Sequence, residues 1–293
     1  PDPTGQTPGA GNAGAGRRSG KRVQRRLLRG WVKGSIAPSF FIRDRLLERF
    51  PDARAVAVVH NGVDLGRFRR QPDAGAAWRS AHCVARGEYL VGCVGQLQRR
   101  RKAQHVLIAA AAASRSRPTL AFVGEGEDES PLRDLAAAAG VRAVFAGFES
   151  DTVAAYNAFD VVALPSRVES FGLAVAEAMA CARPVVAAHA GSVPELLAAP
   201  SEGRLFTPDD AGTLAEELDH LAEDPGLRES LGAAARARVE RDFSLERMVQ
   251  GYEEGFAAAV DGRFGEFALA CSERAAGVSQ APSAGGAPRR VPA

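Results

Sequence analysis

The chain has 293 residues, of which 46% are hydrophobic and 25% charged, and its 37 basic and 35 acidic side chains leave a formal charge of +2. This balance is typical of a globular protein and excludes a collagen, a coiled coil or a chain disordered throughout. No apolar run approaches the ~20 residues of a membrane-spanning helix, and the start of the chain has no apolar signal-peptide core. We therefore expect neither a membrane span nor a signal peptide.

Residues 1–30 carry seven basic side chains and one acidic side chain, whereas the remaining chain is mildly acidic. The Gly-, Pro- and Ala-rich start predicts a disordered basic arm, with a short basic helix over 21–34. We expect the arm to be solvated, and peripheral contact with a membrane or with phosphate is the alternative. The acidic remainder argues against nucleic-acid binding.

The four cysteines (Cys83, Cys93, Cys181 and Cys271) are scattered, and no Cys-x-x-Cys or Cys/His cluster occurs. The sequence therefore predicts no metal site. Separated thiols fit a reducing, cytoplasmic setting, at the inner face of the membrane if the basic arm binds there.

Short apolar runs alternate with alanine- and leucine-rich helical patterns along most of the chain. Strands are predicted at Ala55–Val59, Leu90–Val94, Thr119–Val123, Ala143–Ala146, Val161–Leu164 and Pro184–Ala188. Helices are predicted near 39–49, 103–115, 131–139, 151–158, 171–182, 193–198, 209–222, 226–240 and 245–260. Strands that are apolar on both faces and alternate with helices predict an α/β fold with a doubly wound parallel sheet.

The repeats from Leu90 to Phe206 number five, or six if Gly203–Phe206 forms a short last strand, and amount to one complete domain. Residues 31–70 hold one helix, one strand and a turn at 60–64, which is too short for a second domain and is expected to be the end of one. The composition of 279–293 predicts a disordered tail.

Chemistry is expected in the loops after the strands, because ligands of open parallel sheets bind beyond the carboxyl ends of the strands. The loop after Val161–Leu164 contains Glu169, and the helix that follows carries Glu177. The segment 171–173 opens this helix, so its free N–H groups and the positive helix end face the same cleft. Two carboxylates and an anion seat would make a nucleotide-sugar site, and two solvated glutamates are the alternative.

The loop after Leu90–Val94 leads into four consecutive cations, Arg99 to Lys102, and only three of the 37 basic residues are lysines. Cations near a helix N-terminus oppose the helix dipole, and a bound diphosphate would justify them. A solvated basic loop is the alternative. The loop Val123–Glu127 lacks the third glycine of a dinucleotide fingerprint, which argues against NAD, and its acidic residues favour a solvated loop.

These loops, in this order, resemble the donor-binding half of the retaining glycosyltransferases of family 4 (glycosyl transferases group 1), which have the GT-B fold. The run DVVALPSRVESFGLAVAEAMACARPVVAAHAGSVPE resembles the family's donor signature, with its Glu-x7-Glu pair at Glu169 and Glu177. The runs VGQLQRRRKAQHVLIAA and VVHNGVDLGRF resemble its phosphate-binding segment and the segment that joins its two domains. The resemblance covers roughly 35–260.

The resemblance implies transfer of a sugar, with retention of configuration and without a metal or other cofactor. The donor would be a UDP-, GDP- or ADP-linked sugar, and the acceptor an unknown glycan, lipid or small molecule. Glu169 would contact the transferred sugar, Lys102 would stabilise the leaving diphosphate, and Glu177 would bind the ribose. The other donor-binding residues implied are Gln96, Arg101, Phe171, Gly172, Leu173, Gly147 and Phe148, the last two near the base.

Three positions depart from the family pattern. Gln96 stands where the family usually has an arginine, so one charge contact to the diphosphate is missing. The loop 95–102 is slightly longer than usual, and this makes Arg101 a rival for the role of Lys102. Ala103 and Ser192 replace glycines.

The implied organisation is a disordered basic arm (1–30), a remnant of the N-terminal GT-B domain with the interdomain connection (31–70), a Rossmann-like donor domain with a C-terminal crossover helix (71–262) and a disordered tail (263–293). Residues 1–54 hold no counterpart of the family's acceptor domain. Because residue 1 is proline, we expect either a cropped chain or a natural remnant. The alternatives are a catalytically incomplete nucleotide-sugar-binding half-domain that needs a partner chain, or a related epimerase or phosphorylase.

Overall fold

The computed structural model describes residues 34–51, 53 and 55–279, with side chains described up to residue 273. The described residues form two compact units, one of 34–37, 43–58 and 254–279, and one of 38–42 and 59–253. The predicted basic arm, nearly all of the predicted helix over 21–34 and the end of the predicted tail lie outside the described residues. These units divide the chain elsewhere than at residue 70, and the assignment of 31–70 to a domain remnant stays a prediction.

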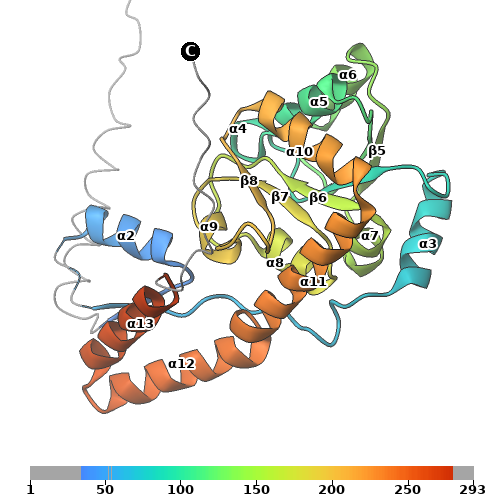
Figure 1. The fold of residues 1–293 in the computed structure, drawn as a ribbon. Coiled ribbons are helices and arrows are strands. Elements are labelled where there is room, and N and C mark those ends of the chain that lie inside the picture. Colours follow the sequence, from blue (N-terminus) through green and yellow to red (C-terminus); the bar gives the residue numbers. More distant parts are fainter. Residues whose placement is uncertain (1–33, 52, 54, 280–293) are drawn as a thin grey trace, which may run out of the picture. The chain divides into compact units, whose positions relative to one another are not determined.

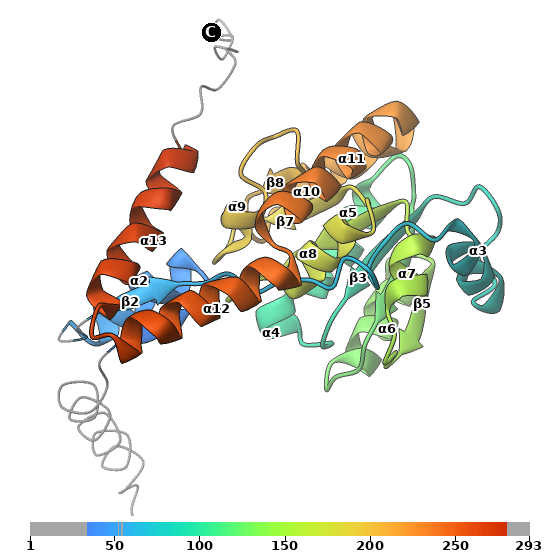
Figure 2. The ribbon, with the colours of Figure 1, turned by 90° about the horizontal axis from the view of Figure 1, so that it is seen from below.

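The first unit is built on two short parallel strands, β1 (Ser35–Ala37) and β2 (Val56–Val58). The helix α13 (Phe264–Ser279) packs against β2 and buries Phe264, Ala268 and Cys271 with Ala57 (Figure 2). The prediction of a disordered tail over 263–293 is therefore wrong for 264–279. Apolar residues spaced four and three apart give this helix one buried face, a periodicity that the flanking Ala- and Gly-rich sequence obscured.

The second unit is a six-stranded parallel sheet with strand order β5-β4-β3-β6-β7-β8, covered by helices on both faces (Figure 1). Its strands are β3 (Leu90–Val94), β4 (Thr119–Val123), β5 (Ala143–Gly147), β6 (Val161–Leu164), β7 (Val185–Ala188) and β8 (Arg204–Phe206). Its helices are α3 (Pro72–Ala81), α4 (Arg99–Lys102), α5 (Gln104–Ala113), α6 (Glu129–Ala138), α7 (Val153–Ala158), α8 (Leu173–Ala180), α9 (Val193–Leu196), α10 (Ala211–Glu223) and α11 (Pro225–Asp242). Two further helices, α2 (Phe40–Arg49) and α12 (Leu245–Val260), contribute residues to both units. The predicted doubly wound sheet is confirmed, including its sixth strand.

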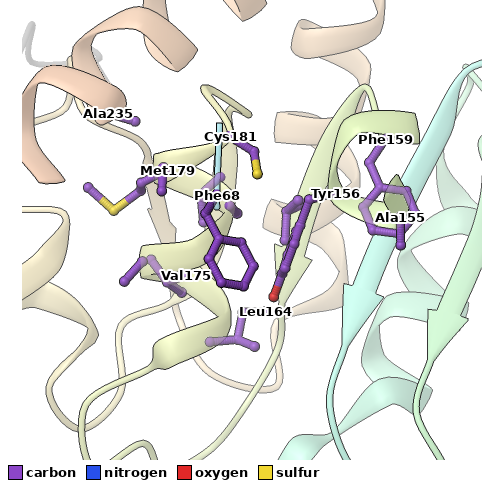
Figure 3. Close-up of a cluster of buried hydrophobic side chains, with 14 of the residues drawn as sticks. Phe68, Ala155, Tyr156, Phe159, Leu164, Val175, Met179, Cys181 and Ala235 are labelled. Carbon is purple, nitrogen blue, oxygen red and sulfur yellow. The ribbon is translucent and has the colours of Figure 1, made fainter. Parts of the chain in front are cut away.

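Alternate residues of each strand point to opposite faces of the sheet, so the apolar runs build two cores. Val91 and Leu120 pack with α5 and α10, whereas Leu90 and Ala121 pack with α7 and α8. Figure 3 shows the second of these cores, in which the Tyr156 ring lies beside Phe68. The chain passes from the first unit to the second at residue 59, and Val63 and Phe68 belong to the second of these cores.

The helices α3 and α4 were not predicted. In α3 only Gly75 and Trp78 are buried, which leaves no helical stripe of apolar residues to recognise. Gly75 lies so close to α7 that a Cβ atom would be 2.3 Å from the carbonyl oxygen of Asn157. The helix α4 consists of four cations and has no buried residue.

A buried carboxylate ties α10 to the end of α5. Asp219 accepts hydrogen bonds from the Ser114 hydroxyl (2.5 Å), the Ser116 N–H (2.9 Å) and the Arg115 N–H (3.1 Å). Burial raises the pKa of Asp219, but these hydrogen bonds outweigh it and hold the pKa well below the ordinary value of 3.8. The ionised carboxylate therefore stabilises the fold.

Asp219→Asn is expected to lower the free energy of unfolding by about 2 kcal/mol at neutral pH, because an amide cannot accept three hydrogen bonds. A folded-state pKa below the unfolded one gives stability that is present above the unfolded pKa of 3.8 and is lost as the pH falls toward the folded pKa. The difference in free energy of unfolding between wild type and Asp219→Asn should therefore become smaller below about pH 4, as measured by denaturant titration. Asp134→Asn, at an exposed helix carboxylate, is the control, and a pH-independent gap for Asp219→Asn would contradict the assignment.

Candidate functional site

The two loops that the sequence singled out lie on either side of the point where the strand order reverses. β3 and β6 are hydrogen-bonded neighbours, and the chain runs from β3 outward to β4 and β5 on one side and from β6 to β7 and β8 on the other. In open parallel sheets the crevice beyond this switch point is where ligands bind. The loops 95–98 and 165–172 both leave the sheet there.

The two predicted catalytic residues meet in an ion pair across the switch point. The Nζ atom of Lys102 lies 2.6 Å from the Oε1 atom of Glu169, and their side chains are 21% and 9% exposed. A carboxylate this buried needs a partner, because an unpaired buried charge is costly. Arg101, the rival for this position, is exposed.

The lysine is presented by α4, which is held at both ends. At its start, Asp128 accepts from the Arg99 N–H (2.7 Å) and from its guanidinium (3.0 Å). Toward its end, the Arg167 N–H donates to the carbonyl of Arg101 (2.9 Å). The Arg167 guanidinium, which is paired with Asp209 (2.9 Å), also donates to the carbonyls of Arg99 (3.1 Å) and Arg100 (3.0 Å). The helix that presents Lys102 is therefore fixed to the loop that carries Glu169.

Ala103 ends α4 in the left-handed conformation, with φ +51°, and is fully buried. This conformation favours glycine, in keeping with the glycine that the resemblance led us to expect at this position. The replacement keeps the backbone path at the cost of local strain.

The acidic loop after β4 is not merely solvated, as the sequence suggested. A Cβ atom on Gly124 would lie 2.2 Å from the Gly95 carbonyl oxygen, and one on Gly126 would lie 2.1 Å from that of Leu97. Asp128 neutralises Arg99, as described above. The loop 124–128 therefore packs against the segment 95–99, and its two glycines allow the backbones to approach this closely. Gln96 is exposed, and its backbone carbonyl accepts a hydrogen bond from the side-chain amide of Gln104 at 2.8 Å.

The start of α8 lies immediately after Glu169. Gly172 caps the helix with φ +89°, a conformation for which glycine is preferred. The Phe171 ring is buried and lies 5.8 Å from the Phe243 ring and 6.0 Å from the His60 ring, whereas Leu173 is exposed. The first N–H groups of a helix have no partner within it, so this end can bind an anion.

Glu177 lies one helical turn further along α8 and is half-buried. The Tyr156 hydroxyl donates to its Oε2 atom at 2.8 Å. Burial raises the pKa of Glu177, and the hydrogen bond from Tyr156 and the positive charge of Arg67 offset part of that rise. Tyr156 is fully buried and holds the carboxylate in place.

The loop after β5 presents Phe148, whose side chain is 70% exposed. Gly147 starts the loop with φ +76°. The Trp78 indole N–H donates to Glu149 at 2.7 Å, and Arg67 pairs with Asp151 at 3.1 Å. The contacts of Glu149 and Asp151 hold this loop in place, and an exposed aromatic ring on such a loop is suited to stacking on a flat ligand.

Residues 191–192 support the backbone of Glu169 from behind. The Ser192 N–H and hydroxyl both donate to the Glu169 carbonyl, at 3.1 and 3.3 Å. Gly191 has φ +59°, and a Cβ atom on it would lie 2.2 Å from the same oxygen. This contact sets the position of Glu169.

Gly191→Ala is expected to destabilise the protein by about 2 kcal/mol more than Gly140→Ala. Gly140 is the matched control, because its φ of +65° is similar but a Cβ atom would meet nothing within 4 Å. Both changes carry the strain of an L-residue at positive φ, and only the first displaces Glu169. Equal losses in denaturant unfolding would contradict the packing role of Gly191.

Sequence reasoning missed several residues of this site. Three charged residues fix α4, namely Arg167, Asp209 and Asp128, and Tyr156 orients Glu177. The His60 ring lies beside that of Phe171 and pairs with Glu195. None of them belongs to a local motif that reveals its partner, because each partner lies far away in sequence. Within the described part of the chain, no group of three or more His, Cys, Asp or Glu is placed to hold a metal ion, and no helix is both long and apolar enough to cross a bilayer.

Comparisons with known proteins agree with this architecture. A D-inositol 3-phosphate glycosyltransferase of Salinispora arenicola is 39% identical over 239 residues, which cover 73% of this chain and 52% of that protein. A GDP-mannose-dependent monoacylated alpha-(1-6)-phosphatidylinositol monomannoside mannosyltransferase of Corynebacterium glutamicum is 34% identical over 64% of this chain and 52% of its own length. The chain spans about half the length of these curated relatives.

Among solved structures, HepE of Anabaena in complex with UDP-glucose superposes with a TM-score of 0.76 and 28% identity, over 82% of this chain and 68% of that one. The C-terminal domain of a glycosyl transferase group 1 family protein from Francisella tularensis is covered over its whole length, at 27% identity and a TM-score of 0.56. The family described as glycosyl transferases group 1 matches residues 76–238, more than half of the chain. The chain therefore belongs to the glycosyl transferases group 1 family.

Proposed function

We propose that this chain binds a nucleotide-diphosphate sugar and forms the donor side of a glycosyltransferase that transfers the sugar with retention of configuration. The observation that carries the proposal is the Lys102–Glu169 pair, 2.6 Å apart at the switch point of the sheet and next to the open start of α8. An anion seat, a cation and a carboxylate in one crevice match a donor with a diphosphate and a sugar. Membership of the family and the UDP-glucose bound to HepE support the donor class.

The leaving diphosphate would lie between Lys102 and the N–H groups at the start of α8. Breaking the bond between the sugar and the phosphate moves negative charge onto the diphosphate, and fixed positive groups stabilise this charge where it develops. The anomeric carbon becomes positively charged in the same step, and Glu169 would stabilise this charge. A second source is a phosphate oxygen of the donor on the same face of the sugar, which is consistent with retention. The proposal assigns these tasks to residues of the chain and needs no metal or other cofactor.

The nucleoside would be held by Glu177 on α8 and by Phe148 in the loop after β5. Glu177 would accept hydrogen bonds from the vicinal hydroxyls of the ribose, and Tyr156 keeps its carboxylate in position. The Phe148 ring would stack on the base. The donor is a UDP-, GDP- or ADP-sugar, and the acceptor is a glycan, a lipid or a small molecule. We propose a cytoplasmic location for this activity, with the basic arm (1–30) as a contact to the inner face of the membrane.

A binding panel tests the proposal. UDP-, GDP- and ADP-sugars are titrated into the protein by calorimetry, and hydrolysis of the donor is followed in the same samples. Selective binding of one nucleotide supports the donor site and names its class, and hydrolysis supports catalysis by this chain. Binding without hydrolysis favours the second candidate, a nucleotide-sugar-binding half-domain that needs further chain or a partner. The chain's coverage of about half of its relatives' length keeps this candidate open. Binding of none of the three would refute the donor site.

A further inference from the structure

Glu195, which no catalytic argument uses, holds three donors that are distant in sequence. Its carboxylate accepts from the Phe40 N–H, the Phe41 N–H and the Nε2 atom of His60, each at 2.9 Å. An ionised carboxylate only accepts, so the tautomer of His60 places its proton on Nε2. The first two donors begin α2, where a negative charge also complements the helix dipole. All of these residues belong to the second compact unit.

The segment that Glu195 holds reaches the donor loop directly. Ser39 is fully buried, and its hydroxyl donates to the carbonyl oxygen of Ser170 at 2.6 Å while accepting from the Ile42 N–H at 3.2 Å. The His60 ring lies 6.0 Å from the Phe171 ring. Residues 170 and 171 thus rest on groups whose own positions depend on Glu195.

The same acidic residue belongs to the short helix whose start supports Glu169. Ser192, which precedes α9, donates twice to the Glu169 carbonyl. Ser192 therefore holds the backbone of Glu169, Ser39 holds that of Ser170, and the His60 ring lies beside the ring of Phe171. Glu195 joins these groups into one hydrogen-bonded block.

We propose that Glu195 is a positioning residue for the donor loop, acting with His60 and Ser39 to hold residues 169–171 where they meet the sugar and diphosphate. This inference rests on the proposed function. The groups assigned to the nucleoside, Glu177 and Phe148, lie on α8 and on the loop after β5. Tyr156, which donates to Glu177, and Trp78, which donates to Glu149 beside Phe148, are not part of this network. Loss of Glu195 should therefore weaken binding of the sugar and diphosphate more than binding of the nucleoside. A general loss of stability would weaken both alike.

The test compares Glu195→Gln and Ser39→Ala with Glu88→Gln in the full chain. Glu88 is the matched control, because its side chain is 19% exposed like that of Glu195, and it accepts from the Ala85 N–H at 2.9 Å. It lies before β3, at the opposite end of the strand from the site. Calorimetry gives the affinity for the nucleotide sugar that the wild type prefers and, by competition, for the bare nucleoside.

Glu195→Gln and Ser39→Ala are each expected to weaken binding of the nucleotide sugar about fivefold and to leave the nucleoside within about twofold, whereas Glu88→Gln changes neither. The double variant should lose less than the product of the single losses, because both residues act through one network. Ser39→Ala removes a single oxygen atom and decides the matter if Glu195→Gln does not fold. Unchanged binding, or equal losses for both ligands, would overturn the positioning role. A wild type that binds no nucleotide sugar would instead refute the proposed function.

Discussion

Lys102→Ala is expected to weaken binding of a nucleoside diphosphate about 100-fold and to leave the bare nucleoside nearly unaffected. Two effects add in the same direction. The variant loses a charge-assisted contact worth on the order of 3 kcal/mol at the diphosphate. It also leaves the Glu169 carboxylate without the partner that lies 2.6 Å away, so that an uncompensated negative charge faces the anion. Titration with the nucleoside, its monophosphate and its diphosphate measures the split.

Two further variants separate these effects. Lys102→Ala combined with Glu169→Gln removes the repelling charge and should recover part of the lost diphosphate affinity. Arg100→Ala removes an exposed cation from the same short helix and should have a small effect, since its charge is screened by solvent. An equal loss for Lys102→Ala and Arg100→Ala would show that the general positive field matters rather than the paired lysine. Equal losses for the nucleoside and the diphosphate would contradict a phosphate role altogether.

Glu177→Ala is expected to weaken nucleoside diphosphate binding more than about tenfold, because hydrogen bonds from two ribose hydroxyls to a charged acceptor are lost. The nucleoside should lose affinity by the same factor, which is the reverse of the pattern at Lys102. The 2′-deoxy form of the preferred nucleotide is the matched ligand: it keeps one of the two hydroxyls, so the difference in affinity between wild type and variant should be smaller for it than for the ribonucleotide. Unchanged affinity of Glu177→Ala for the ribonucleotide would remove this residue from the site.

Glu177→Gln should in addition stabilise the fold at neutral pH. Burial raises the folded-state pKa of Glu177 above its ordinary value of 4.5, so the protonated form is favoured on folding. The raised pKa contributes free energy of unfolding that is fully present below pH 4.5 and is lost as the pH rises through the folded-state pKa. The variant avoids that loss, so its advantage in melting temperature should appear at neutral pH and vanish in acid. A variant that is less stable than the wild type at neutral pH would mean that the carboxylate serves the fold and not a ligand.

The fold was largely predictable because its signals are local. A strand buried on both faces must be apolar throughout, as Val161–Leu164 is, and the alternation with helices leaves a covered parallel sheet as the solution. The elements that escaped prediction have no such signal. In α3 the need for a glycine at position 75 arises only from the Asn157 backbone that packs against it. In α13 the buried stripe is hard to recognise because small residues surround it.

The candidate site divides in the same way. Its loops follow from the rule that ligands bind at the carboxyl ends of parallel strands, and Glu169, Lys102 and Glu177 follow from motifs within those loops. The sequence favoured Lys102 and left Arg101 as a rival, because the turn at Ala103 and the side chain that reaches Glu169 are decided only by folding. In the structure Lys102 pairs with Glu169 and Arg101 is exposed, and the roles of the residues stay predictions for the experiments above.

The sequence by itself determined the α/β architecture, the family and the loops in which to look, since periodicity and motif spacing are properties of neighbouring residues. The tertiary structure alone decided which charges pair and what supports them. Arg167 with Asp209 behind α4, Gly191 against Glu169, and Glu195 with His60 are all partners from separate stretches of the chain. Their energies depend on distance and burial after folding, and neither quantity is present in a linear pattern.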